Sequence, residues 1–209
     1  MRAQRSSVLA SLPKGRMRTA RWWRIGLALV ASTSFAPAAA LTPIADFDIA
    51  KYYGKWYEVG GIPGFFQNKC ARDVQTEYAA DESGAIILRR RCTRADGGIE
   101  ANEGRGRSLD ANVPAVLKVT YVNQLGIWWY PLGRNQIVIA AGPDYGWLVI
   151  GDPTLRFGRI LARKPALSKD SLRTVAAALV AEGYDGCAFV LKPQTGAREQ
   201  ETRLCDELR

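Results

Sequence analysis

Hydrophobic and polar positions alternate in short runs along most of the chain after Gly54. Apolar residues at every second position are typical of a β-strand that buries one face. Turn residues separate the runs, for example Asp96-Gly97-Gly98 and Gly142-Pro143-Asp144. The pattern predicts eight strands: Lys55–Gly60, Asp73–Ala79, Ala85–Arg91, Ile99–Leu109, Val116–Val122, Gln136–Ala140, Gly146–Gly151 and Phe157–Arg163. Strands at this regular spacing, without helices between them, indicate an antiparallel barrel or sandwich.

One segment near the C-terminus has the spacing of an amphipathic helix. Ser168 can cap its start, and Gly183 is a natural stop. The apolar face predicted between them consists of Leu172, Val175, Ala176, Leu179 and Val180. A ninth strand, Cys187–Leu191, follows, and the polar chain beyond Pro193 is expected to be loose except where Cys205 holds it. The sequence predicts no second folded domain.

The first forty residues have the layout of a secretory signal peptide. Residues 1–24 are basic and free of acids, Ile25–Phe35 is an apolar run, and Ala38-Ala39-Ala40 fits the cleavage-site pattern. The apolar run is too short to anchor the chain in a bilayer. We therefore expect a signal peptide at 1–40 and a soluble protein that is periplasmic or secreted. The first cysteine is Cys70, so we expect no lipid anchor at the cleavage site.

The charge distribution and the absence of histidine exclude several kinds of function. Seven of the 29 basic residues lie in the first forty residues, so 22 basic residues face 20 acidic ones in the rest of the chain. Phosphate binding needs a concentrated basic face on the folded part, so we expect no nucleic-acid partner. The chain has no histidine, which excludes Ser-His-Asp catalysis and imidazole metal sites. We expect no cofactor and no metal, and binding rather than catalysis.

The cysteines predict two disulfides. None of Cys70, Cys92, Cys187 and Cys205 forms a C-x-x-C pair, and an exported protein meets an oxidising compartment. Folding the two strands around the turn Asp81–Gly84 as a hairpin brings Cys70 close to Cys92. This favours Cys70–Cys92 with Cys187–Cys205. The nested pairing Cys70–Cys205 with Cys92–Cys187 is the alternative.

Three motifs occur in an order that resembles the lipocalin family. Gly54-x-Trp56 resembles the first-strand motif of that family, and Pro143-Asp144-Tyr145 resembles its second conserved region. The stretch Ile160–Pro165, which includes Arg163, resembles the third. The resemblance extends from about Phe47 to Leu191 and is closer to the bacterial lipocalins and apolipoprotein D than to other branches.

The resemblance implies an all-β fold, an eight-stranded antiparallel up-and-down lipocalin barrel with a C-terminal α-helix and a short ninth strand. It implies a lipocalin domain at 41–192, followed by a polar tail at 193–209 that a disulfide tethers. Trp56 would close the bottom of the barrel, and the guanidinium of Arg163 would lie across its ring in a cation–π contact. The other end would open as a cup with room for one small ligand.

Alternation along the strands predicts which residues face the inside of this cup. With Trp56 set inward, Gly60 is expected inward as well, whereas Ile137 and Ile139 are expected to pack under the helix. Similarity to apolipoprotein D supports the three positions on the second strand. The predicted ligand-binding residues are Glu58, Val74, Thr76, Tyr78, Leu117, Val119, Tyr121, Gln136, Val138, Phe157, Arg159 and Leu161. Plain barrel core is the alternative role for most of them.

Two of these residues would be ionised inside an apolar cup. A buried charge is costly unless it is paired. Arg159 and Glu58 can pair with each other, or Arg159 can lie near the mouth in water. The sharper hypothesis is that Arg159 receives a carboxylate or phosphate head group. The run Arg89-Arg90-Arg91 is interpreted as a solvated strand end.

An aromatic segment lies in the predicted loop between the fifth and sixth strands, at the open end. Leu125–Leu132 contains Trp128, Trp129 and Tyr130, and Phe65 with Phe66 lies in another open-end loop. Apolar tips of this kind seldom stay exposed without a role. The segment is interpreted as a lid, as a tip for peripheral membrane contact, or as a loop packed against its neighbour.

The residues and the resemblance together predict a non-catalytic protein that binds, transports or stores a small hydrophobic ligand in the bacterial envelope. Fatty acids, lysophospholipids or similar molecules are the ligands that the resemblance implies. The first alternative is a lipocalin-fold enzyme that acts on a small lipid and uses Glu58 or another carboxylate in the cup as acid or base. The second is a protein-interaction module, such as a homodimer built through Trp128 and Trp129.

Overall fold

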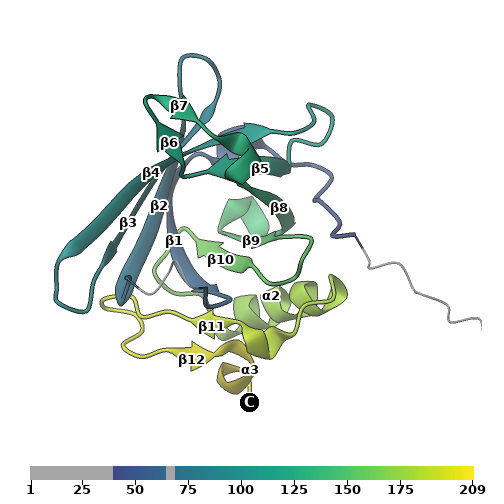
Figure 1. Ribbon diagram of the computed structural model, residues 1–209. Helices are drawn as coiled ribbons and strands as arrows, with labels where there is room; N and C mark the ends of the chain where they lie inside the picture. Colours follow the sequence, from purple (N-terminus) through teal and green to yellow (C-terminus); the bar gives the residue numbers. More distant parts are fainter. Residues whose placement is uncertain (1–39, 65–68) are drawn as a thin grey trace, which may run out of the picture. The chain divides into compact units, whose positions relative to one another are not determined.

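An antiparallel barrel forms the body of the computed structural model, which describes residues 40–64 and 69–209 (Figure 1). All of these residues belong to one compact unit, 38–209. The signal peptide predicted at 1–40 lies outside the described residues except for its last position. Phe65 and Phe66 also lie outside them.

Eight strands form the wall of the barrel. They are β1 (Gly54–Gly61), β2 (Arg72–Ala80), β3 (Ile86–Thr93), β4 (Ile99–Ser108), β5 (Val116–Thr120), β8 (Arg134–Ala141), β9 (Trp147–Gly151) and β10 (Gly158–Ala162). Each pairs with the next in antiparallel fashion, and β10 returns to pair with β1. Tyr57 lies opposite Ala162, and Gly61 lies opposite Arg159. This closure confirms the predicted up-and-down barrel and excludes a sandwich.

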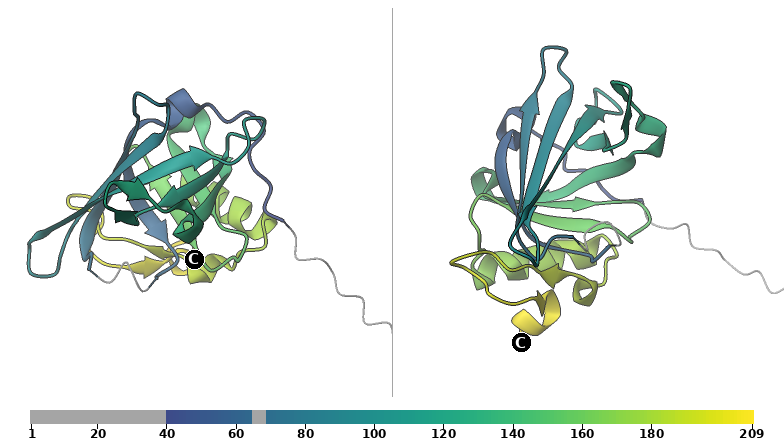
Figure 2. Two further views of the ribbon diagram at one scale, coloured as in Figure 1. Left: turned by 45° about the horizontal axis from the view of Figure 1, so that its top comes forward. Right: turned by 60° about the vertical axis from the view of Figure 1, so that its left-hand side comes forward.

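The shorter elements lie at the ends of these strands and in the C-terminal part of the described chain. The helices are α1 (Ile49–Tyr52), α2 (Lys169–Ala181), α3 (Leu204–Glu207) and the 3-10 turns η2 (Tyr130–Leu132), η3 (Pro143–Tyr145) and η4 (Gly186–Ala188). The short strands are β6 (Asn123–Gln124), β7 (Ile127–Trp128), β11 (Val190–Leu191) and β12 (Thr202–Arg203). In both views of Figure 2 the yellow-green and yellow C-terminal elements lie together along one side of the barrel.

Helix α2 covers one outer face of the barrel. Ser168 caps it, since its side chain accepts a hydrogen bond from the backbone N–H of Ser171 at 3.1 Å. A buried apolar layer joins the helix to the strands and contains Leu172, Val175 and Leu179 of α2 with Ile137, Ile139, Val149 and Ile160 of the sheet. Ile137 and Ile139 therefore pack under the helix as predicted. Val180, predicted on the apolar face, is instead 63% exposed because the face that contacts the sheet is narrower.

A bulge in β1 corrects one predicted orientation. The pairing of β1 with β10 shifts register between Glu58 and Gly60. A Cβ atom added to Gly60 would lie 3.1 Å from Ile160 and Leu191, both in the outer apolar layer. Gly60 therefore faces outward, whereas the prediction from simple alternation placed it inward. The extra residue at a bulge reverses the alternation that follows it.

The C-terminal segment is more ordered than the sequence predicted. The predicted ninth strand, Cys187–Leu191, is reduced to β11, because η4 takes up Cys187. The polar tail predicted to be loose contains β12 and α3, and Leu204 is fully buried. It also contains the buried Gln194. Burial of these residues supplies the ordering that the polar composition does not suggest.

This segment completes the barrel wall where β1 and β2 separate. Strand β1 pairs with β2 only through its first half, and β11 pairs with Gly60 and Gly61 in its second half. The backbone N–H of Lys192 donates to the carbonyl of Val59 at 2.9 Å, and that of Asp73 donates to the carbonyl of Pro193 at 3.1 Å. Residues from the end of the chain are thus brought against the side of the barrel that carries Glu58.

Candidate ligand-binding site

The floor of the barrel is built from the first and third sequence motifs. Trp56 is fully buried, and its indole N–H donates to the carbonyl of Tyr52 at 2.7 Å. The guanidinium carbon of Arg163 lies 3.6 Å from the centre of the Trp56 ring. The same guanidinium donates to the carbonyls of Lys55 at 2.8 Å and Tyr53 at 2.9 Å. The arrangement closes this end and has a structural role.

The second motif holds the N-terminal segment across the same end. In η3, Asp144 and Tyr145 have positive φ angles of 50° and 54°, which turn the chain sharply between β8 and β9. The hydroxyl of Tyr145 accepts a hydrogen bond from the backbone N–H of Asp48 at 2.6 Å. The side chain of Asp48 in turn caps α1 by accepting from the N–H of Ala50 at 2.9 Å. The motif therefore positions the helix that leads into Tyr52 and Trp56.

The interior above this floor is lined by apolar side chains from the barrel strands. Tyr121 packs against a buried apolar cluster that contains Trp56. Six predicted ligand-binding residues belong to this cluster: Tyr78, Leu117, Val119, Val138, Phe157 and Leu161. Val74 is also buried, at 2% exposure, and Thr76 and Gln136 are buried polar residues. Leu88 of β3 and Ile150 of β9 belong to the same cluster and were missing from the predicted set. Contact of any of these residues with a ligand stays a prediction.

A buried ionic cluster lies on the wall formed by β1, β3, β10 and the C-terminal segment. Its centre is the carboxylate of Glu58, which has no exposed surface. The guanidinium of Arg159 lies 3.4 Å from this carboxylate and that of Arg90 lies 3.6 Å from it. Lys192 donates a hydrogen bond to its other oxygen. We call these four residues the Glu58 cluster. The predicted pairing of Arg159 with Glu58 is present, with two further cations beside it.

The cluster carries a surplus of positive charge. Burial by itself would raise the pKa of Glu58, but Lys192, Arg159 and Arg90 together outweigh that effect and hold it well below the ordinary value. Burial would also lower the pKa of Arg159, whereas the Glu58 carboxylate raises it. Glu58 is therefore ionised at neutral pH. One carboxylate faces three cations, so two positive charges are not balanced within the cluster.

Three tyrosine side chains adjoin Arg159 inside the barrel. The rings of Tyr52 and Tyr78 lie 4.4 Å apart, and both side chains are fully buried. The ring of Tyr121 lies over Gly104, where an added Cβ would come within 2.8 Å of it. Burial, and after it the neighbouring Tyr121, raises the pKa of Tyr78 to about 12. The hydroxyl of Tyr78 thus keeps its proton and remains a hydrogen-bond donor at neutral pH.

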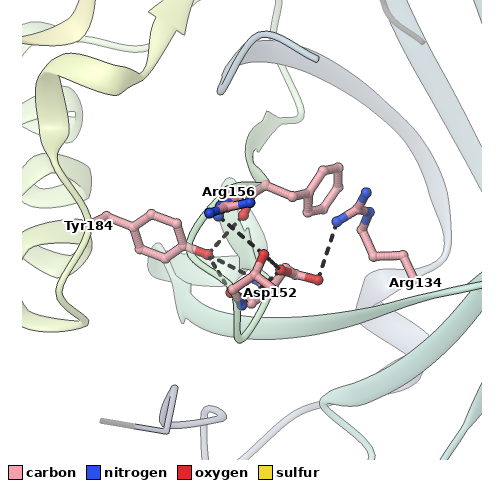
Figure 3. Close-up of polar contacts among 6 residues, drawn as sticks. Arg134, Asp152, Arg156 and Tyr184 are labelled. Carbon is pink, nitrogen blue, oxygen red and sulfur yellow. Dashed lines mark hydrogen bonds and ion pairs between the residues drawn. The ribbon is translucent and has the colours of Figure 1, made fainter. Parts of the chain in front are cut away.

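The mouth of the barrel carries a second arginine. The guanidinium groups of Arg134 and Arg159 lie 4.8 Å and 4.9 Å from the centre of the Phe157 ring. Figure 3 shows the contacts that hold the β9–β10 loop in place: the hydroxyl of Tyr184 donates to the carbonyl of Phe157 at 2.8 Å and accepts from the N–H of Asp152 at 2.8 Å. Arg134 completes the network with an ion pair to Asp152 at 3.4 Å.

The aromatic open-end loop packs only in part against its neighbour. Arg105 lies 4.9 Å from the ring centre of Trp128, and Arg107 lies 4.3 Å from that of Tyr130, so β4 holds one side of the loop. On the other side of the loop four large apolar side chains are exposed to water: Leu125 (102% exposed), Ile127 (64%), Trp129 (45%) and Leu132 (68%). Within residues 40–64 and 69–209, no helix is long and apolar enough to cross a membrane.

Both favoured disulfides are present, which confirms the predicted pairing. Cys70 is bonded to Cys92 with Cα atoms 5.5 Å apart, and Cys187 is bonded to Cys205 with Cα atoms 5.0 Å apart. The first bond ties the loop after β1 to β3, next to Arg90, whose guanidinium lies 3.5 Å from the sulfur of Cys70. The second ties α3 to η4. The nested pairing is excluded.

Besides Leu88 and Ile150, sequence reasoning missed three residues with polar side chains, Arg90, Tyr52 and Lys192, and it placed Arg90 in solvent. Arg90 was interpreted as part of a solvated run, but only Arg89 and Arg91 are exposed, whereas Arg90 is 7% exposed. Arg90 lies two positions after the buried Leu88 in β3, and this period-two spacing could have predicted that Arg90 faces inward. Tyr52 and Lys192 lie outside the predicted barrel strands, so alternation gave no signal for either.

The chain is similar to known proteins over most of its described length. A family model described as a lipocalin-like domain matches residues 47–194. The outer membrane lipoprotein Blc of Escherichia coli strain K12 is 25% identical over 169 residues, covering 81% of this chain and 92% of Blc. Apolipoprotein D of Macaca fascicularis is 34% identical over 145 residues, covering 67% of this chain and 73% of that protein.

Solved structures give a likeness of fold. The structure of insecticyanin from the tobacco hornworm Manduca sexta has a TM-score of 0.59 with this chain at 16% sequence identity. The match covers 79% of this chain and 94% of insecticyanin. At this level of identity the likeness concerns the barrel and its connections alone.

Proposed function

This chain belongs to the lipocalin family, as its family-model match and its relatives show, and from that premise we propose that it binds one small hydrophobic molecule non-covalently inside its barrel. The membership confirms the resemblance predicted from the three motifs. Lipocalins are known for binding small hydrophobic ligands and are typically not enzymes. Transport or storage of the bound molecule is the role that we propose for this chain.

The observation that carries the proposal is the composition of the barrel interior. Apolar side chains from β1 to β10 line it above a floor closed by Trp56. Ligand sites are mostly apolar with a few placed polar groups, and here the polar groups are the Glu58 cluster and the neighbouring tyrosines. Each methylene of an alkyl chain that leaves water for such an interior contributes about 0.8 kcal/mol. Fatty acids and lysophospholipids are the ligand classes that combine an alkyl chain with a charged head group.

The ionic state of Glu58 supports binding over catalysis. A general acid or base works best when its pKa lies near the working pH. The cations around Glu58 hold its pKa far below neutrality, so its carboxylate neither releases nor takes up a proton readily at neutral pH. Glu58 is therefore poorly suited to act as the acid or base in the enzyme alternative.

We place the working protein in the bacterial envelope. The pattern of residues 1–40 is that of a signal peptide. The two disulfides support export as well, since such bonds persist in oxidising compartments. One relative carries the name outer membrane lipoprotein. In this chain the sulfur of Cys70 is bonded to Cys92 and is therefore not available to carry a lipid.

We propose in addition that the open-end loop touches a lipid surface while the ligand is exchanged. Its four exposed apolar side chains and the adjoining Arg105 and Arg107 support this role. Tryptophan side chains favour membrane interfaces, and arginine attracts anionic lipids. A homodimer through the same loop is the alternative occupant.

The test is native mass spectrometry of the mature protein isolated from a periplasm, followed by organic extraction and identification of what it carries. A lipid present at one molecule per chain is expected. A barrel that carries nothing and does not bind added fatty acids or lysophospholipids would overturn the proposal. Product formed from either lipid class would favour the enzyme alternative, and a dimer lost on Trp129→Ser would favour the interaction module.

A further inference from the structure

The distribution of polar groups within the barrel gives information about how a ligand is oriented. Four large exposed apolar side chains lie in the open-end loop, on the rim. Unbalanced charge lies inside, in the Glu58 cluster. A ligand with its charged head at the mouth would meet the apolar rim and would leave the interior charge uncompensated, which is costly in a low-dielectric site.

Several interior polar atoms have no well-formed hydrogen bond among the described residues. They include Nη1 of Arg159, Nη2 of Arg90 and the hydroxyl oxygens of Tyr52, Tyr78 and Tyr121. Buried donors without acceptors are rare in folded proteins, and each such atom needs an explanation. Two of these atoms are guanidinium donors and three are hydroxyls, which can donate, and they come from α1, β2, β3, β10 and the residue after β5. The side-chain oxygens of Thr76 and Gln136 also lack a hydrogen bond among the described residues. Two buried guanidinium donors beside hydroxyls that can donate favour an anionic acceptor at this place.

The position of Arg159 makes it the centre of this group. It is 7% exposed and lies 3.4 Å from the Glu58 carboxylate. Burial raises the pKa of Tyr52 and Tyr78, and the charge of Arg159 opposes part of that rise, as expected for a cation close to both hydroxyls. Tyr52 lies 6.4 Å from Trp56, ring centre to ring centre, so the group extends to the floor of the barrel. The donors therefore span the interior, from Arg159 beside Phe157 near the mouth to Tyr52 beside the floor.

We propose that Arg159, with Arg90 and the hydroxyls of Tyr52, Tyr78 and Tyr121, binds the anionic group of the ligand inside the barrel. The ligand enters with its carboxylate or phosphate first, and its alkyl chain runs outward to the open-end loop. This inference rests on the proposed function, because it names the chemical class and the direction of the ligand inside the same barrel. A carboxylate or phosphate would add negative charge beside Arg159 and Arg90, which share the single Glu58 carboxylate, and would accept hydrogen bonds from them.

The test compares ligands that share an alkyl chain and differ in charge. Dodecanoic acid, its methyl ester and dodecyl phosphate are titrated calorimetrically into the mature protein. The acid or the phosphate is expected to bind at least tenfold more tightly than the ester, and the tighter of the two identifies the head group. Equal affinity for acid, phosphate and ester would overturn this inference and leave the proposed function standing. Absence of binding by all three would instead count against the proposed function.

The variants Arg159→Met and Arg91→Met form a matched pair. Arg91 lies on the outer face of the barrel and contacts Gln75 at 2.9 Å, so its loss is expected to leave the preference for the acid unchanged. Arg159→Met is expected to abolish that preference and to leave the affinity for the ester within about twofold. Arg159→Met still folds, because Glu58 keeps Arg90 and Lys192. Retention of the full preference in Arg159→Met would overturn the assignment, and the double variant Tyr78→Phe, Tyr121→Phe checks the hydroxyls independently.

The direction of the ligand has its own measurement. Dodecanoic acid with a nitroxide at its methyl end is bound to protein labelled with nitrogen-15 in its tryptophan rings. The proposal predicts strong broadening of the indole N–H signals of Trp128 and Trp129 and little effect on Trp56. Broadening of Trp56 above that of the other two would place the alkyl chain at the floor and overturn the proposed direction.

Discussion

The guanidinium of Arg163 lies 3.6 Å from the centre of the Trp56 ring and donates hydrogen bonds to backbone carbonyls that lead into β1. One side chain from the end of the last barrel strand therefore holds both the floor residue and the entry to the first strand. Closure of the barrel between β10 and β1 depends on the same two segments.

Removal of Arg163 should therefore destabilise the barrel without changing its interior. We expect Arg163→Met to lower the free energy of unfolding by about 2–4 kcal/mol, from the lost cation–π contact and the charged hydrogen bonds. Urea unfolding followed by tryptophan fluorescence measures the change. The neighbouring Lys164→Met is the control, since Lys164 is exposed and should change stability by less than about 0.5 kcal/mol. Equal effects of the two substitutions would contradict the role given to Arg163.

Glu58 should couple stability to acid pH. Its folded-state pKa lies below the unfolded value of about 4.3. Its contribution is therefore fully present above pH 5 and is lost as the pH falls toward the folded-state pKa. We expect Glu58→Gln to cost about 3–5 kcal/mol at pH 7, because it removes the carboxylate that faces the buried guanidinium groups of Arg90 and Arg159. The difference from the wild-type protein should shrink in thermal unfolding curves as the pH falls below about 4.3, because the unfolded wild-type chain protonates Glu58 there while the folded protein keeps it ionised.

A second measurement on the same variant separates charge from packing. Bound dodecanoate should restore part of the stability of Glu58→Gln, because ligand binding to the folded state stabilises it by mass action and the carboxylate supplies the missing charge. Methyl dodecanoate should restore less. Equal rescue by both molecules would indicate that packing alone was lost.

Alternation along the sequence was enough to predict the strands and many inner positions, such as Leu117, Val119 and Leu161. The barrel, as opposed to a sandwich, was predicted from the resemblance to the lipocalins. The helix was predicted from its i, i+3 and i+4 spacing, and the disulfides from the hairpin that brings Cys70 near Cys92. Alternation fails where the backbone departs from regular pairing. The bulge after Glu58 turns Gly60 outward, and no local feature of the sequence announces it.

Long-range contacts explain the other differences. Lys192 lies 134 positions after Glu58 and reaches it only because β11 replaces β2 as the neighbour of β1. Arg90 lies in a run of three arginines that the sequence predicts to be solvated, and only the folded structure brings it beside the Glu58 carboxylate. The pattern within a single strand therefore could not predict either cation, although both determine the electrostatics of the candidate site.

The Cys187–Cys205 disulfide should anchor the C-terminal segment that carries Lys192 and Gln194. Replacing both cysteines with serine should lower the free energy of unfolding by about 3 kcal/mol, from the chain-entropy cost of a loop of this size. Differential scanning calorimetry gives the change in the melting temperature. Faster hydrogen exchange at β11 and β12 than in β9 should accompany it. Unchanged exchange at β11 would show that the paired strands hold the segment without the covalent bond.

Tyr184 should control the position of Phe157 at the mouth. Its hydroxyl donates to the carbonyl of Phe157 and accepts from the N–H of Asp152, both at 2.8 Å. Tyr184→Phe removes these contacts and leaves buried backbone groups unpaired, so we expect a loss of about 1–3 kcal/mol in unfolding experiments. The affinity for dodecanoate should fall as well, since Phe157 packs against Arg159. Tyr57→Phe, on the outer side of β1, is the control and should leave the affinity unchanged.

The open-end loop should bind lipid surfaces through its four exposed apolar residues. Each large apolar side chain that enters the interface contributes up to about 1.5–3 kcal/mol, so replacement of Ile127 and Leu132 by serine should weaken binding to vesicles at least tenfold. Co-sedimentation with vesicles of phosphatidylglycerol and phosphatidylcholine measures this, and raised salt should weaken binding further because Arg105 and Arg107 adjoin the loop.

The exposed Val180 on α2 offers a matched control, since Val180→Ser removes an equally exposed apolar side chain far from the loop in the sequence. Vesicle binding that Val180→Ser weakens as much as the loop substitutions would refute the assignment. A chain that remains monomeric by sedimentation velocity, with or without Trp129→Ser, would leave the membrane as the partner of the loop and exclude the homodimer.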